Sequence, residues 1–153
     1  MSLEHPQVMM PPPALYLGGL LMGYGLDRAI HFPPVGFAGD QWLVLALAVI
    51  GILLVLAAAI QLRLAKTTVM PHRAASTLLT TGIFALSRNP IYLGFTCLAA
   101  AMALSQHSAG MMLMLIPVVW VIHSHVIAAE EAFHAERFAE AWKDYCRKTR
   151  RWI

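Results

Sequence analysis

The sequence predicts an all-α integral membrane protein with about four transmembrane helices and a C-terminal amphipathic helix. Of its 153 residues, 59% are hydrophobic and 12% carry a charge, which is about half the charged share of an average soluble domain. The apolar residues form long runs, and residues 89–129 contain no Asp, Glu, Lys or Arg. A soluble domain needs polar residues to cover its core, so these runs indicate that lipid surrounds the helices.

The placement of charge favours a membrane protein over a nucleic-acid-binding one. The net charge is +3, and the basic residues fall mainly in two blocks beside apolar runs, within 63–88 and 137–151. Nucleic-acid binding would require a folded basic face with polar or aromatic readers, so we expect no nucleic-acid partner. Cys97 lies in an apolar run and Cys146 in a charged one, and we expect both to be reduced thiols.

The first two predicted spans precede the first basic block. The first covers residues 8–26 and begins among three prolines, which a helix tolerates at its start. No Lys or Arg precedes it, so we expect a retained helix rather than a signal peptide. Its Gly19 and Gly23 form a GxxxG pair, which allows close helix packing but is common by chance. A loop at 27–40 leads to the second span, an uninterrupted apolar segment at 42–60.

The charge-free stretch supplies the third and fourth predicted spans. Its only polar cluster is 105–110, which predicts a tight hairpin between spans at about 90–104 and 111–129. The third span is short for a bilayer about 30 Å thick at a rise of 1.5 Å per residue. The 63–88 loop holds four Lys or Arg and the tail holds six. Both termini are therefore expected in the cytoplasm, with the spans in a membrane such as the bacterial inner membrane.

Residues 130–148 follow the pattern of an amphipathic helix. Its aromatic and polar positions recur every three or four residues and share one face. They are Glu131, His134, Phe138, Trp142 and Tyr145. We expect this helix either to lie along the cytoplasmic membrane surface or to fold back over the bundle.

Two polar clusters lie at the same predicted level of the membrane. Residues 87–94 open the third span, and Glu130 and Glu131 follow the fourth. Because the hairpin returns the chain to the side that it left, the two clusters should be neighbours. Two carboxylates at a bilayer edge need a cationic partner, and Arg88 is the nearest candidate. The pattern fits a ligand site or an interfacial anchor.

The order of these elements resembles a known family. The central segments are Thr67-Thr68-Val69, Thr81-Gly82-Ile83-Phe84 and Ser87-Arg88-Asn89-Pro90-Ile91-Tyr92-Leu93-Gly94. The later segments are Glu130-Glu131-Ala132-Phe133, Arg137-Phe138, Trp142, Tyr145 and Arg150-Arg151-Trp152-Ile153. Together they resemble the isoprenylcysteine carboxyl methyltransferase and phospholipid methyltransferase superfamily, especially its small bacterial members. The resemblance covers residues 62–153 of what we expect to be a single domain, 1–153. Asn89 stands where the eukaryotic enzymes have His, and Trp142 where the family often has Tyr.

The resemblance implies transfer of a methyl group from S-adenosylmethionine to a lipophilic acceptor, such as an isoprenylcysteine carboxylate, an aminolipid, a quinone-like molecule or a small thiol. Arg88 and Glu131 would carry catalysis. Charge matching would place the two carboxylates near the ammonium and sulfonium of the cofactor, and Arg88 near its carboxylate. Gly94 would allow close approach of the cofactor. The implied cofactor-binding residues are His72, Gly82, Phe84, Arg88, Asn89, Pro90, Tyr92, Gly94, Glu130 and Glu131.

Other function classes stay open. A non-catalytic membrane subunit or a transporter component could use the same helices. The seven histidines suggest a haem- or metal-binding protein as an alternative. His123 and His125, however, are two residues apart in a predicted helix and point to different faces, so we expect no metal. Arg147 and Arg151 are expected to contact the membrane surface rather than a substrate. The oligomeric state and the methylated atom are left open.

Overall fold

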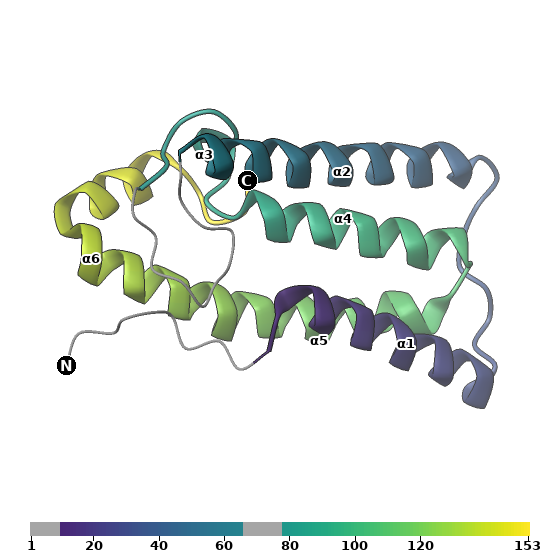
Figure 1. Ribbon diagram of the computed structural model, residues 1–153. Coiled ribbons are helices and arrows are strands. Elements are labelled where there is room, and N and C mark those ends of the chain that lie inside the picture. The colour runs from purple at the N-terminus through teal and green to yellow at the C-terminus, as the bar shows by residue number, and fades with distance from the viewer. Residues whose placement is uncertain (1–9, 66–77) are drawn as a thin grey trace.

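The structure is a computed structural model that describes residues 10–65 and 78–153. Every regular element in these two segments is a helix, as the sequence predicts. The four longest helical rods lie side by side along one direction (Figure 1). In chain order the elements are α1 (Pro12–Ile30), α2 (Asp40–Leu64), α3 (Ile83–Leu86), α4 (Pro90–Ser105), α5 (Ala109–Val121), the π-helix η1 (Ile122–Val126) and α6 (Ile127–Lys148).

Two helical runs in the described part of the chain are long and apolar enough to cross a membrane. They are α2 and the continuous 40-residue run Ala109–Lys148, which contains α5, η1 and α6, while α4 is a shorter apolar helix. Only 17% of the most apolar window of α2, and 28% of that of the longer run, is buried inside the protein. A core helix of a soluble protein would be mostly buried, so these exposed apolar surfaces favour contact with lipid.

The first helix ends later than the sequence predicts. It begins at the prolines, as expected, but continues to Ile30, so the connecting loop is shorter than the predicted 27–40. The reason is a contact with the start of α5, where the carboxylate of Asp27 accepts hydrogen bonds from the hydroxyl of Ser108 and, at 2.8 Å, from the backbone N–H of Gly110. An acidic group stabilises the N-terminus of a helix, and this partner holds the last turn of α1 in place.

Glycines allow the helices to pack closely in two pairs, α1 with α5 and α2 with α4. A Cβ atom on Gly23 would lie 2.6 Å from the carbonyl oxygen of Gly110 in α5. A Cβ atom on Gly51 would lie 2.8 Å from the carbonyl oxygen of Gly94 in α4. The backbones therefore approach each other at positions where only glycine fits, and Gly23 of the predicted GxxxG pair serves the contact between α1 and α5.

The last helix turns back over one end of the bundle (Figure 1). The turn lies at Ala139, whose backbone has φ 42° and ψ −111° inside α6. Beyond it, the hydroxyl of Tyr145 donates a hydrogen bond of 2.5 Å to the carbonyl oxygen of Phe84 in α3. Of the two predicted placements of the amphipathic helix, the structure shows the one that folds back over the bundle.

Candidate functional site

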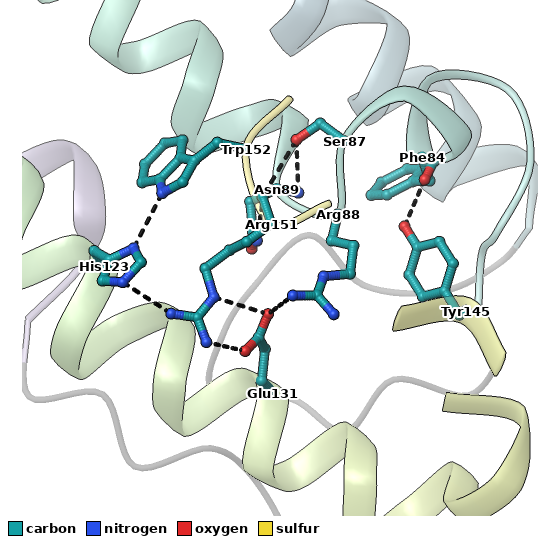
Figure 2. A network of polar contacts seen from close by, with 9 residues as sticks. All are labelled: Phe84, Ser87, Arg88, Asn89, His123, Glu131, Tyr145, Arg151 and Trp152. Carbon is teal, nitrogen blue, oxygen red and sulfur yellow. Dashed lines mark hydrogen bonds and ion pairs between the residues drawn. The ribbon is translucent and has the colours of Figure 1, made fainter. Parts of the chain in front are cut away.

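Three charged side chains form the centre of a polar network at the end of the bundle where α6 turns back (Figure 2). The guanidinium Nη2 of Arg88 lies 3.0 Å from Oε1 of Glu131. Arg151 donates from Nε to the same oxygen at 3.2 Å and from Nη2 to the other carboxylate oxygen. The exposed fractions of these side chains are 12% for Arg88, 16% for Glu131 and 30% for Arg151. A two-pronged contact of this kind fixes orientation as well as charge.

The segment before α4 holds the C-terminal tail through its backbone. The N–H of Arg88 donates to the carbonyl oxygen of Arg150 at 3.0 Å. The carbonyl oxygen of Arg151 accepts from Nδ2 of Asn89 at 3.0 Å and from the hydroxyl of Ser87 at 3.4 Å. Both Ser87 and Asn89 are buried. These contacts explain how a tail far along the chain delivers its side chains to Glu131.

The two adjacent glutamates have different partners. Oε1 of Glu130 accepts a hydrogen bond of 2.6 Å from the hydroxyl of Tyr92, in the first turn of α4. Tyr92 is itself held from the other side, since the hydroxyl of Tyr16 in α1 donates to its carbonyl oxygen at 3.2 Å. Glu131 instead binds the two arginines. Only Glu131 is therefore neutralised by cations among the described residues.

Arg88 is enclosed but retains one donor without a partner. Its guanidinium carbon lies 5.6 Å from the ring centroid of Trp142, which turns back with the second half of α6. Its Nε is buried and has no hydrogen-bond partner among residues 10–65 and 78–153. A buried donor in this state costs free energy, and an anionic ligand would relieve that cost.

His123 lies between two hydrogen-bond donors. Nη1 of Arg151 lies 3.0 Å from its Nε2, and Nε1 of Trp152 lies 3.1 Å from its Nδ1. The His123 and Trp152 rings are nearly parallel, at 11°. Arginine and the indole N–H only donate, whereas a neutral imidazole accepts at one nitrogen only. One of the two N–H groups therefore has no hydrogen-bond acceptor at His123.

An aromatic cluster of α6 adjoins this network through Trp142, whose ring contacts Arg88. The ring of His134 lies 5.1 Å from that of Trp142 and 5.8 Å from that of Phe138. Burial lowers the pKa of His134 below its ordinary value, because the charged form loses its hydration. Burial likewise raises the pKa of Tyr145. Both groups are therefore neutral at neutral pH.

Comparison with known proteins identifies the family. The family model of phospholipid methyltransferases matches residues 40–141, which is two thirds of the chain. The chain belongs to the phospholipid methyltransferase family. This confirms the resemblance given by the sequence, and it makes the protein a member of a family of membrane methyltransferases. No curated protein and no solved structure matches the chain.

The matched region contains Arg88, Tyr92 and both glutamates of the network, whereas Arg151 and Trp152 lie beyond its end. The structure brings Arg88 and Glu131 together, which confirms the predicted neighbourhood of the two polar clusters. The contacts of the tail therefore involve residues beyond the region that the family model matches.

The other residues of the predicted cofactor site occupy different environments. Phe84 offers its backbone carbonyl to Tyr145, and Pro90 is fully buried in the first turn of α4. Gly82 has φ +59°, and a Cβ atom there would lie 2.7 Å from Oε1 of Gln61 in α2. His72 lies outside the described residues.

Gly94 requires a correction. A Cβ atom there would lie 2.7 Å from Cγ2 of Val55 and 2.9 Å from the carbonyl oxygen of Gly51, both in α2. The side of Gly94 on which a side chain would project is filled by α2. This is the environment of a helix-packing residue. The backbone face that we expected to contact the cofactor is occupied by α2.

Sequence reasoning missed three residues of the network, namely Arg151, His123 and Trp152. The expectation that Arg151 contacts the membrane surface is wrong, because its guanidinium binds Glu131. Arg147 is exposed and pairs with Asp144 at 3.2 Å. One signal for Arg151 was available, since the arginine pair at the end of the chain belongs to the family pattern to which the sequence is similar. The spacing of the pair does not show which arginine turns inward.

Proposed function

We propose that the protein is an S-adenosylmethionine-dependent membrane methyltransferase that methylates a lipophilic acceptor at the cytoplasmic face of the membrane. The observation that carries this proposal is the ion-paired network of Arg88, Glu131 and Arg151, which joins an apolar helical hairpin in a chain of a methyltransferase family. Ionisable groups at the edge of an apolar bundle are costly, and a ligand site is a reason to keep them.

The residues present fit the cofactor, and the fit refines the roles that were expected. The unpartnered Nε of Arg88 suits the carboxylate of S-adenosylmethionine, which a guanidinium can bind. Glu131 already binds two guanidinium groups, so its role is to position Arg88 and Arg151. Glu130, which is bound only by a neutral phenol among the described residues, is the carboxylate that remains to face the cationic part of the cofactor.

Held by Arg88 and Glu130, S-adenosylmethionine would supply an activated methyl group for transfer to a lone pair of the acceptor, and the electrons of the carbon–sulfur bond would stay on sulfur. The protein residues then have to align the two partners and exclude water, which is where rate enhancement arises in such transfers. The network fixes two arginines against one carboxylate, and the ring of Trp142 packs against Arg88.

The proposed arrangement in the membrane has four spans with both termini in the cytoplasm. Two helical runs have the length and composition to cross, and α1 and α4 lie alongside them (Figure 1). The end of the bundle that carries the polar network also carries the basic tail, and the rule that positive residues stay inside supports a cytoplasmic position for this end.

The test of the proposed function is ligand-dependent stability. S-Adenosylhomocysteine should raise the thermal unfolding temperature of the purified protein in detergent, because a ligand that binds only the folded state stabilises it. Adenosine, which lacks the carboxylate and ammonium groups, should raise it far less. An equal response to both compounds, or to neither, would favour a non-catalytic membrane subunit.

A further inference from the structure

His134 is a titratable group that the proposed function does not use. It lies in the aromatic cluster of α6, with its ring centroid 5.1 Å from that of Trp142, 5.8 Å from that of Phe138 and 5.9 Å from that of Phe133. Its Nδ1 is buried and has no hydrogen-bond partner in the part of the chain that the structure describes. A charged imidazole in this setting would lose hydration without gaining a partner, so the surroundings favour the neutral ring.

The cluster joins the two halves of α6 across the turn at Ala139. His134 and Phe138 precede this turn, and Trp142 follows it. Trp142 is buried, and the guanidinium carbon of Arg88 lies 5.6 Å from its ring centroid. The contact between His134 and Trp142 therefore holds the second half of α6 beside the arginine that is proposed to bind the carboxylate of the cofactor.

Two cations already face rings of the cluster. Arg88 faces the ring of Trp142, and the guanidinium carbon of Arg137 lies 6.0 Å from the ring centroids of both phenylalanines. An aromatic face attracts a cation, but these faces already have one each. A charge on His134 would add a third cation among the same rings.

The nearby carboxylates do not compensate such a charge. Glu131, one turn before His134 on α6, favours its protonation, but this carboxylate already binds two guanidinium groups. Glu130 is hydrogen-bonded to Tyr92, and Tyr145, beyond the turn, is a neutral phenol. Burial is the largest effect, and the pKa of His134 lies below its ordinary value.

We propose that protonation of His134 breaks its contact with Trp142, so that mild acid releases the second half of α6 from the cofactor site. In the released form the imidazole reaches water and has the ordinary pKa of about 6.5. The packed form binds the proton less readily. It is therefore fully favoured above this pH, and it loses stability as the pH falls below it. The inference rests on the proposed function only for the identity of the site as a cofactor site.

The experiment follows hydrogen exchange of the backbone amides of residues 140–148 in the full chain in detergent. Protection factors, which already correct for the intrinsic exchange rate, report how often this segment opens. Between about pH 8 and about pH 5.5 the wild-type protection should fall about tenfold, because a solvated imidazole is then about ten times more often protonated than neutral. Protection of α5 is the internal reference and should not change.

Variants assign the response to His134. His134→Phe keeps an aromatic ring beside Trp142 but cannot be protonated, so its protection should be the same at both pH values. His134→Leu, a second replacement that cannot be protonated, should behave in the same way. His125→Phe is the matched control, because His125 is exposed and faces another tryptophan, Trp120, with ring centroids 5.6 Å apart. It should keep the tenfold fall. Constant protection in the wild type, or a fall that persists in both His134 variants, would overturn the inference.

S-Adenosylhomocysteine separates this inference from the proposed function. Added at about pH 8, it should raise the protection of residues 140–148, since a ligand that binds the packed form shifts the population toward it. A ligand effect without the pH effect would leave the methyltransferase proposal standing and show the role of His134 to be wrong. A pH effect without a ligand effect would support the acid-sensitive contact and contradict the proposed cofactor site.

Discussion

Nη2 of Arg88 and Oε1 of Glu131 lie 3.0 Å apart, although the apolar hairpin of α4 and α5 separates the two residues along the chain. Both side chains are largely enclosed, so each charge depends on the other for its stability. Removing one partner of such a pair leaves an uncompensated charge, which costs more than the pair itself contributes. This relationship makes Glu131 the position at which the site is most sensitive to substitution.

Glu131→Gln should weaken binding of S-adenosylhomocysteine by about ten- to a hundredfold, the effect of losing one charge-assisted contact. The reason is indirect, because the amide no longer holds Arg88 and Arg151 in place. Calorimetry on the purified variant measures this. Glu140→Gln is the matched control, since Glu140 is exposed and, within residues 10–65 and 78–153, pairs only with Lys143. Wild-type affinity in both variants would remove Glu131 from the site.

Arg151→Lys should lower methyl transfer and S-adenosylhomocysteine affinity by about tenfold, because lysine keeps the charge but cannot form the two-pronged contact. Arg147→Lys, at an exposed position, is the control and should behave as wild type. Calorimetry and transfer of labelled methyl groups to membrane extract report the two effects. If both variants match wild type, the tail contributes only to membrane contact.

Ala139→Gly should raise the free energy of unfolding by about 1 kcal/mol. The positive φ of Ala139 is a conformation that glycine adopts without the steric cost to an L-residue, and this gain exceeds the entropy that glycine loses on folding. Ala135→Gly, one turn earlier in the regular part of α6, should instead lower stability by about 0.5–1 kcal/mol. Thermal unfolding in detergent compares the two, and destabilisation by both would contradict the turn at Ala139.

Gly94→Ala should destabilise the fold by about 1–3 kcal/mol, since the added methyl group must displace Val55 or the backbone of Gly51 in α2. The fraction that remains folded should bind S-adenosylhomocysteine normally. Gly25→Ala is the control, because a Cβ atom there meets nothing within 4 Å. A Gly94→Ala variant with normal thermal stability but weak binding would instead return Gly94 to the cofactor site.

A reporter fused after Ile153 should be active when it requires the cytoplasm and inactive when it requires export. The expectation comes from the basic residues of the tail and of the 63–88 loop, which favour the cytoplasmic side. A second fusion within residues 106–108, the turn between α4 and α5, should give the opposite pattern. Export-dependent activity of the C-terminal fusion would exclude the four-span arrangement proposed above.

The class of fold and the first contact of the site were predictable from the amino-acid sequence. Long apolar runs are a local property of composition, and they predict helices in lipid without reference to any partner. The proximity of Arg88 and Glu131 was also predictable, because a hairpin of two apolar helices must bring its ends together. Family membership was also visible, since the motif around Arg88 is continuous in the chain.

The direction in which individual residues face depends on how the helices pack, and it became visible only in the folded protein. Arg147 and Arg151 are similar in the sequence, and the backbone contact between Arg88 and Arg150 turns only the second toward Glu131. Gly94 follows Arg88 by six residues in the sequence, yet the packing of α2 occupies its open side. The turn at Ala139 could not be predicted from the sequence, because α6 contains no proline or glycine. These outcomes depend on which surfaces meet across the bundle, and helical periodicity sets the spacing along a face but not the partner that covers it.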